Sequence, residues 1–180
     1  YCQRQLTTAK HIEHFYPRNQ FGFRFKHLTF DWSNLLGSCN DSNTCGNHKD
    51  SVIGDGHYNP QLLLKPDRDN PENLFYYYEN GAIDIDPKKL ISPYDQQRVD
   101  ETIRVFNLKN KLLEQLREKA ISCYLDMADE INNQLNLCEN DPDLIQICVK
   151  KAENVLLSAE GLEFSNIIKS TFKTRLGISL

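Results

Sequence analysis

The sequence predicts an α+β protein with a small, turn-rich amino-terminal part, a β-hairpin and a mainly α-helical carboxy-terminal half. Three observations lead to this fold class. All five histidines and three of the six cysteines lie in the first 57 residues. Two strand-like runs flank the dipeptide Asn80-Gly81, and helical periodicity dominates from Ser92 onward. We therefore expect three segments, with these bounds: 1–57, 58–92 and 93–180.

The composition limits the possible environments and partners. Charged residues make up 26% of the 180 residues and the net charge is -4. No run approaches the roughly 20 apolar residues that span a bilayer, so we expect no membrane segment. An acidic balance argues against a wholly basic nucleic-acid coat, so nucleic-acid contact would need a local basic patch or a metal ion. The mixture of cysteine and histidine favours metal binding in the reducing cytoplasm over disulfides.

The first segment should contain a strand over residues 10–16, a second strand that includes Asn34, and a short helix over residues 46–54. This order would form a ββα unit. In the first strand, Glu13 and His14 should point to opposite faces unless the chain bends before the following proline. Asn34 could also be a turn residue that closes a hairpin.

The rest of the chain carries clearer local signals. Residues 73–86 should form a hairpin, because Asn-Gly favours a tight type I′ turn. Ser92-Pro93 is typical of a capped helix start. After an interruption at "NLKN", a long amphipathic helix should cover residues 111–135, with an apolar face of Leu112, Leu113, Leu116, Ala120, Tyr124 and Met127. Asp141-Pro142 should start another helix that ends near residue 158, and residues 164–175 should form a last, short one.

Cys2, Cys39 and Cys45 are candidate ligands of a structural zinc ion. Such a site normally has four ligands in a closed tetrahedral shell. The fourth would most simply be a cysteine three positions before Cys2, upstream of Tyr1. A buried thiol or a disulfide remains an alternative for the Cys39–Cys45 pair. The remaining cysteines should be buried free thiols of the helical part, and they are Cys123, Cys138 and Cys148.

A second group combines Glu13, His14, Asn34 and His48. If the short helix brings His48 back toward the first strand, a ββα unit can gather one carboxylate, two imidazoles and one amide around a divalent ion. A structural histidine is the alternative interpretation of His14.

These motifs together resemble a known family. "IEHFYP" at 12–17, W-x-N-L at 32–35 and the paired cysteines followed by "NHK" resemble the HNH (ββα-metal) endonucleases, in their zinc-supported branch. More narrowly, they are similar to the HNH subunit of Septu and retron anti-phage defence systems, of the PtuB type. "LLLKPDRDNPENLFYYYENGAIDID" and "TIRVFNL" share this similarity. The resemblance thus covers most of the first 110 residues.

The resemblance implies a role for each residue of the second group. His14 matches the general base that takes a proton from the attacking water. Glu13 stands where the family has an acidic metal ligand, and Asn34 matches the central Asn, which steadies the loop and helps to orient His14. His48 matches the last ligand of the catalytic ion. Asn47 is also eligible, but imidazole is the better ligand for a transition metal.

The resemblance also implies cofactors and partners. The catalytic ion would be Mg²⁺ or Mn²⁺, beside the structural zinc. The substrate would be nucleic acid, with DNA favoured and RNA such as tRNA a serious second. The partner would be a PtuA-like ATPase subunit and, in a retron, also a reverse transcriptase with its non-coding RNA and DNA. The alternative from another class is a non-catalytic, zinc-stabilised binding module.

Side chains around these motifs could also contact substrate. Arg18, Arg24, Lys26 and Lys49 are candidates for phosphate binding. Phe30 and Trp32 are expected to be packing residues rather than platforms for base stacking.

Overall fold

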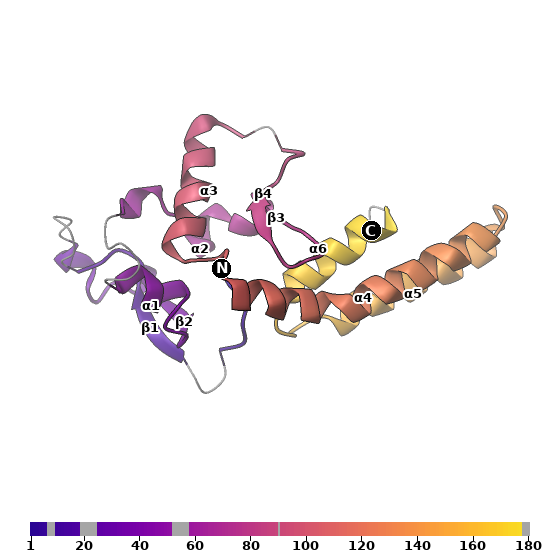
Figure 1. Ribbon diagram of the computed structural model, residues 1–180, viewed down its shortest axis with the longest axis horizontal. Helices are drawn as coiled ribbons and strands as arrows, with labels where there is room; N and C mark the ends of the chain where they lie inside the picture. Colours follow the sequence, from indigo (N-terminus) through magenta and orange to yellow (C-terminus); the bar gives the residue numbers. More distant parts are fainter. Residues whose placement is uncertain (7–9, 19–24, 52–57, 90, 178–180) are drawn as a thin grey trace. The chain divides into compact units, whose positions relative to one another are not determined.

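The computed structural model describes residues 1–6, 10–18, 25–51, 58–89 and 91–177 (Figure 1). It confirms the α+β class, because two small sheets precede a helical carboxy-terminal half. The chain forms two compact units. The first comprises Tyr1–Tyr76 and Ile83–Lys111, and the second comprises Tyr77–Ala82 and Leu112–Leu180. Residues 93–111 therefore belong with the amino-terminal unit, whereas the sequence analysis groups them with the later helices.

The first unit contains a strand–strand–helix succession. Strand β1 (Lys10–His14) pairs antiparallel with β2 (Leu35–Cys39), and Glu13 lies opposite Leu36 in the register. Helix α1 (Cys45–Asp50) follows and packs against β2. The helix is shorter than expected, because Ser51 is its C-cap and has extended dihedral angles. The sequence therefore predicted the order of these elements and overestimated the length of the helix.

Asn34 does not belong to the second strand. It ends a 3₁₀ turn, Trp32–Asn34, immediately before β2. The Asp31 side chain caps this turn by accepting a hydrogen bond from the Ser33 amide at 2.8 Å. Aspartate competes for local backbone amides in this way, so the chain turns before it extends.

The remainder of the first unit supports this succession. It contains α2 (Pro66–Asp69), the body of the hairpin formed by β3 (Phe75–Tyr77) and β4 (Ile83–Ile85), and α3 (Pro93–Val105). The predicted cap of α3 is confirmed, since Ser92 Oγ accepts from the Asp95 amide at 3.1 Å.

The hairpin is confirmed, but its turn differs from the expected type I′ geometry. The Gly81 amide donates to the Tyr78 carbonyl at 2.9 Å, and the positive φ of 78° falls on Gly81 and not on Asn80. The Asn80 side chain instead accepts from the Ala82 amide at 3.1 Å. This is the pattern of a longer loop with a left-handed glycine before the returning strand.

The second unit is built from three helices and the hairpin tip. Helices α4 (Lys111–Leu137), α5 (Pro142–Ser158) and α6 (Ser165–Leu176) agree closely with the predicted spans. Their shared core consists of Ala128, Ile131, Cys138, Cys148, Ala152, Phe172 and Leu176. As expected, Cys138 and Cys148 are buried free thiols, but Cys123 is exposed. No helix in the described ranges is long and apolar enough to cross a membrane.

The apolar face of α4 is rotated relative to the expectation. Leu112 and Met127 are exposed, and the buried face contains Leu113, Arg117, Ile121, Ala128 and Ile131. The expected face was wrong because Arg117 is buried, whereas a charged residue normally indicates the exposed face of a helix. Its Nη1 donates to the Gly81 carbonyl at 3.3 Å, and its guanidinium lies over the Tyr77 ring. Arg117 thus joins α4 to the hairpin tip within the second unit.

Candidate functional site

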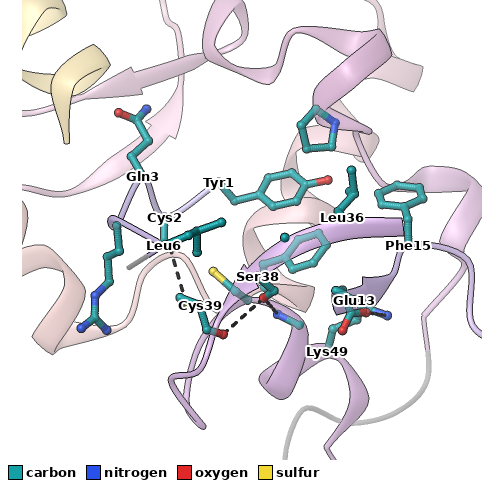
Figure 2. Close-up of a pocket in the computed structure, with 16 residues that line it drawn as sticks. Tyr1, Cys2, Gln3, Leu6, Glu13, Phe15, Leu36, Ser38, Cys39 and Lys49 are labelled. Carbon is teal, nitrogen blue, oxygen red and sulfur yellow. Dashed lines mark hydrogen bonds and ion pairs between the residues drawn. The ribbon is translucent and has the colours of Figure 1, made fainter. Parts of the chain in front are cut away.

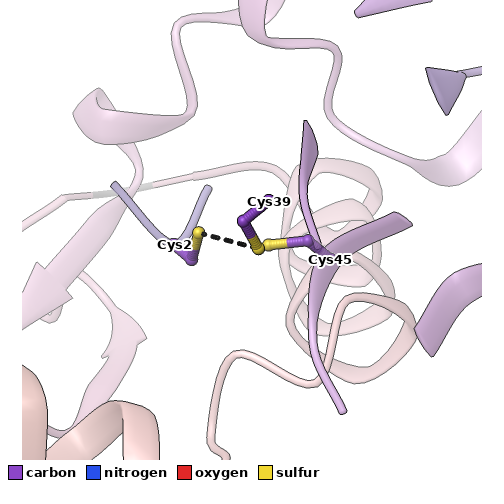
Figure 3. A group of neighbouring side chains, drawn as sticks. All are labelled: Cys2, Cys39 and Cys45. Atoms are coloured by element: carbon purple, nitrogen blue, oxygen red, sulfur yellow. Dashed lines mark hydrogen bonds between the residues drawn. The ribbon is translucent and has the colours of Figure 1, made fainter. Parts of the chain in front are cut away.

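Three cysteines that are distant in sequence meet in the first unit (Figure 3). Cys39 ends β2, Cys45 begins α1, and Cys2 comes from the amino-terminal segment. All three are buried, and their sulfur atoms lie within 4.8 Å of one another. The Cys2 and Cys39 sulfur atoms are 3.7 Å apart. The predicted convergence of these three residues is therefore confirmed, and they could hold a metal ion.

The backbone around the three cysteines is held by specific contacts. Cys45 has a positive φ of 54°, which is uncommon for a residue with a side chain, and its amide donates to the Phe106 carbonyl at 3.0 Å. The Gly46 amide donates to Ser38 Oγ at 3.2 Å. Arg4 pairs with Asp41 at 2.9 Å and so fixes the Cys2 segment to the turn before α1. These contacts hold the backbone in a conformation that brings the three sulfur atoms together.

The three thiols have different proton affinities. Hydrogen bonds from the thiols of Cys2 and Cys45 hold the pKa of Cys39 well below its usual range. Contacts with Cys2 and Cys39 raise the pKa of Cys45, and the contact with Cys39 raises the pKa of Cys2. Each thiol therefore affects the ionisation of the other two. A bound cation would favour deprotonation of all three, because thiolates are the form that ligates a metal.

Glu13 is buried and lies between β1 and α1, where it forms an ion pair with Lys49 (Figure 2). Lys49 has no exposed surface, and its ammonium also donates to the His14 carbonyl at 2.9 Å and to Asp50 Oδ1 at 2.8 Å. Burial opposes the charge on Lys49, but Glu13, Tyr58 and Asp50 outweigh this effect and raise its pKa. This buried lysine is therefore a charged structural centre.

Two further neighbours define the surroundings of Glu13. A Cβ atom added at Gly46 would lie 2.8 Å from the carboxyl carbon of Glu13, so this position on α1 has no room for a side chain. His11 Nε2 lies 3.5 Å from Glu13 Oε2. The sequence analysis missed both contacts, although His11 lies two residues before Glu13 and hence on the same face of β1.

His14 is partly buried at the end of β1, and its Nε2 lies 3.0 Å from the Thr29 carbonyl oxygen. A carbonyl can only accept, so this contact requires the proton on Nε2. In the neutral ring the lone pair is then on Nδ1. The contact thus selects the tautomer and fixes the ring.

Asn34 is 1% exposed and closes the loop between β1 and β2. Its Oδ1 accepts from the Tyr16 amide at 2.7 Å, and its Nδ2 donates to the carbonyls of Tyr16 and Leu28 at 3.1 and 3.2 Å. None of these bonds reaches the His14 ring. However, Leu28 precedes Thr29, so Asn34 fixes the segment that carries the carbonyl bound to His14.

The structure does not bring His48 or Asn47 to Glu13. The Nδ1 atom of His48 lies 2.8 Å from the Val105 carbonyl of α3, and Asn47 donates to Asn40 Oδ1 at 3.4 Å. Among the described residues, the three cysteines are the group of three or more His, Cys, Asp or Glu residues that could share an ion, and Glu13, His14 and His48 do not form another. The expected gathering of two imidazoles and a carboxylate is therefore absent from the described arrangement. The catalytic roles of these residues stay predictions.

Two expectations about the surrounding side chains change. Lys49 cannot contact phosphate from its buried position, whereas Arg18 and Lys26 are exposed, and Arg24 lies outside the described residues. Phe30 and Trp32 are 91% and 84% exposed and so do not pack in a core.

The cysteine cluster and the Glu13–Lys49 pair both line a cavity of about 240 Å³ (Figure 2). Its walls include the side chains of Tyr1, Phe15 and Phe106, and the first and last of these stack at 4.2 Å. Residues of both candidate centres of this unit thus line one space.

Comparison of the chain with protein-family models, with characterised proteins and with solved structures finds no match. The similarity of the motifs to HNH nucleases therefore remains an interpretation of the sequence. The function has to follow from the residues themselves.

Proposed function

We propose that this protein is an HNH-type endonuclease that hydrolyses phosphodiester bonds of nucleic acid, with His14 as its general base. The observation that supports this proposal is the contact between His14 Nε2 and the Thr29 carbonyl, on a loop that Asn34 closes. A structural histidine would need no such loop, whereas a base needs a fixed ring and a defined tautomer. The strand–strand–helix order around this contact agrees with the ββα unit that the motifs imply.

The chemistry assigned to His14 follows from its tautomer. Hydrolysis begins when water attacks phosphorus, and the attacking oxygen must lose a proton. Nδ1 carries the lone pair that takes this proton, and imidazole is the side chain that exchanges protons near neutral pH. The resulting imidazolium keeps its Nε2–H bond to the Thr29 carbonyl, which stabilises the positive charge.

The catalytic ion needs a separate assessment. A bound Mg²⁺ or Mn²⁺ ion would neutralise charge on the phosphate and on the departing oxygen. The described arrangement does not fit such an ion, because Glu13 already binds the Lys49 ammonium and does not form a ligand group with His14 and His48. The contact of His48 Nδ1 with the Val105 carbonyl would by itself be compatible with ligation through Nε2. We therefore assign no step to the ion. If Glu13 is a ligand, Lys49 has to move away from it.

Zinc is the proposed ion for the cysteine cluster. Cys2, Cys39 and Cys45 offer three sulfur ligands, which suits zinc better than Mg²⁺ or Ca²⁺. A structural site needs a fourth donor beside these three. Such an ion would join the amino-terminal segment, the end of β2 and the start of α1, and so hold the unit together around His14.

The resemblance of the motifs supports the remaining parts of the proposal. The protein would act in the cytoplasm as the effector of an anti-phage defence complex with a PtuA-like ATPase, and in a retron with a reverse transcriptase and its RNA and DNA. The net charge of -4 is in keeping with dependence on a partner, because a free acidic nuclease binds nucleic acid weakly.

The test of the base is chemical rescue. Wild-type protein and His14→Gly are incubated with plasmid DNA and with total tRNA, with and without Mn²⁺ or Mg²⁺, alone and with the co-expressed ATPase. We expect the wild type to cleave and His14→Gly to be inactive yet folded by circular dichroism. Added imidazole should restore part of the lost cleavage. Full activity of the variant without imidazole would show that His14 is not the base.

A non-catalytic zinc-stabilised binding module is the second candidate, and the buried Glu13–Lys49 pair favours it. In such a module Lys49 permanently neutralises the carboxylate, and no second ion binds. Metal analysis by mass spectrometry separates the two candidates. The module should retain zinc alone and cleave nothing under any of the conditions above, whereas the nuclease should bind an exchangeable second ion.

A further inference from the structure

Two large aromatic side chains project into solvent close in sequence to Thr29, the residue that contacts the proposed base. Phe30 is 91% and Trp32 is 84% exposed. Phe30 follows the 3₁₀ turn Lys26–Leu28, and Trp32 begins the next one, Trp32–Asn34. Exposed apolar surface of this size costs stability. Single exposed apolar residues are common on protein surfaces. Two exposed aromatic rings within three residues instead indicate a binding site for a ligand that covers them.

The segment that carries them is held by its own hydrogen bonds. The Asp31 amide donates to the Leu28 carbonyl at 3.2 Å, and the Asn34 amide donates to the Asp31 carbonyl at 2.9 Å. The Asn34 side chain also donates a hydrogen bond from Nδ2 to the Leu28 carbonyl at 3.2 Å. The two rings therefore stand on an ordered support, which lowers the entropy lost when a ligand stacks on them.

This support is continuous with the proposed base. The carbonyl that holds the His14 ring belongs to Thr29, the residue directly before Phe30. A group that stacks on Phe30 therefore lies within a short distance along the chain of the contact that fixes His14. Through Thr29, the segment that carries the aromatic pair is thus linked directly to the proposed base.

The charges around this surface suit a phosphate backbone. Lys26 and Arg18 are exposed, and the exposed Arg68 donates to the Tyr16 hydroxyl at 3.2 Å. The nearby acid, Asp31, turns its carboxylate to the Ser33 amide. Lys26 begins the 3₁₀ turn that precedes Phe30, so an exposed cation and two exposed aromatic rings share one segment. This combination is typical of sites for single-stranded nucleic acid.

We propose that Phe30 and Trp32 are a stacking platform for unpaired bases, and that the substrate is therefore single-stranded or locally unpaired nucleic acid. The bases of a duplex are stacked on one another and offer no free faces, so they cannot use these rings. The binding part of this proposal stands by itself. Presentation of a phosphodiester bond to His14 rests on the proposed nuclease function.

The chain has one tryptophan, so stacking on Trp32 reports directly in its intrinsic fluorescence. The full-length protein is titrated, without added Mg²⁺ or Mn²⁺ and at low salt, with 20-nucleotide dT, dA and U oligomers and with a 20-base-pair duplex. We expect saturable quenching by the single strands and little by the duplex. Anisotropy of labelled oligomers should show affinity losses of about 5- to 150-fold for Trp32→Ala and for Phe30→Ala.

Two further variants make this test specific. Trp32→Phe keeps an aromatic face and should retain most of the affinity. Tyr94→Ala removes an exposed aromatic ring of the same unit, on α3, and should bind as the wild type does. Wild-type affinity of both alanine variants at positions 30 and 32, or equal binding of the duplex, would overturn the platform. So would variants that lose a co-purifying protein but keep oligomer binding, because the surface would then be a protein interface.

The outcomes also separate this inference from the proposed function. If His14→Gly quenches normally but does not cleave, both stand. If no protein cleaves but quenching persists, the nuclease fails and the platform survives. If Phe30→Ala and Trp32→Ala cleave single strands at the wild-type rate, the platform fails and the nuclease survives.

Discussion

Replacement of Asn34 by alanine should open the loop between β1 and β2 without unfolding the rest of the first unit. The substitution removes three hydrogen bonds, two to the backbone of Tyr16 and one to the carbonyl of Leu28. Asn34 is 1% exposed, so water cannot replace these bonds unless the loop moves away. At about 1 kcal/mol net for each bond, the loss is about 3 kcal/mol, and more if the Tyr16 amide stays buried and unpaired.

Amide hydrogen exchange at Tyr16 measures this loss at one position. Its amide donates to the Asn34 side chain and should exchange about 100-fold faster in Asn34→Ala. The Phe15 amide is an internal control, because it donates to the Asn34 backbone carbonyl at 2.9 Å, which alanine retains. Urea denaturation should show a matching loss for the first unit.

Asn34→Asp is the matched variant. It keeps an acceptor for the Tyr16 amide but sets an oxygen against two carbonyls at neutral pH. Tyr16 should then stay partly protected, while the unit loses about as much stability as in the alanine variant. Unchanged exchange at Tyr16 in Asn34→Ala, with a stability change below about 0.5 kcal/mol, would show that this side chain does not hold the loop.

Three other predictions test the surrounding structure. Lys49→Met leaves the Glu13 carboxylate buried without its partner and should cost about 3–5 kcal/mol in urea denaturation. The double variant Lys49→Met with Glu13→Gln should recover most of this loss. Equal losses in the single and double variants would show that the ion pair does not stabilise the unit. Gly81→Ala should destabilise the second unit by about 3 kcal/mol or more in thermal denaturation, because φ is 78° and the new Cβ would meet the backbone of Glu114; a loss below about 1 kcal/mol would contradict this packing. Burial raises the pKa of Tyr58 to about 12, so the folded state favours the neutral phenol. The resulting stabilisation of about 3 kcal/mol should be present below pH 10 and should be lost between pH 10 and about 12. In denaturation series over this pH range, Tyr58→Phe should remove that part of the alkaline loss of stability.

The parts of the fold that depend on neighbouring residues in the chain were predictable. Ser92 and Asp141 cap α3 and α5 through bonds to amides two or three positions on, with proline as the next residue in each case. The long period of α4 was equally visible. The buried face of α4 was not, because Arg117 contacts the Gly81 carbonyl and the Tyr77 ring, which lie more than 30 positions away.

The candidate site divides in the same way. The cysteines were identifiable because Cys2 and several histidines accompany the Cys39–Cys45 pair, whose spacing alone is a weak signal. The partner of His14 is a backbone carbonyl, and backbone groups carry no sequence signal. Lys49 looked like a surface cation, and its burial follows from the shape of the first unit around Glu13. Phe30 and Trp32 were assigned to packing because composition alone favours a core for aromatics.

The hairpin tip has a consequence for how this chain can be dissected and synthesised. Tyr77–Ala82 belongs to the second unit although the rest of that unit begins only at Leu112. A fragment cut at residue 112 would lack the loop that covers Arg117, and should be less stable than its length suggests. On the ribosome, this loop emerges early and must wait for α4 before it finds its place, so the two units complete their folding in an interleaved order rather than one after the other.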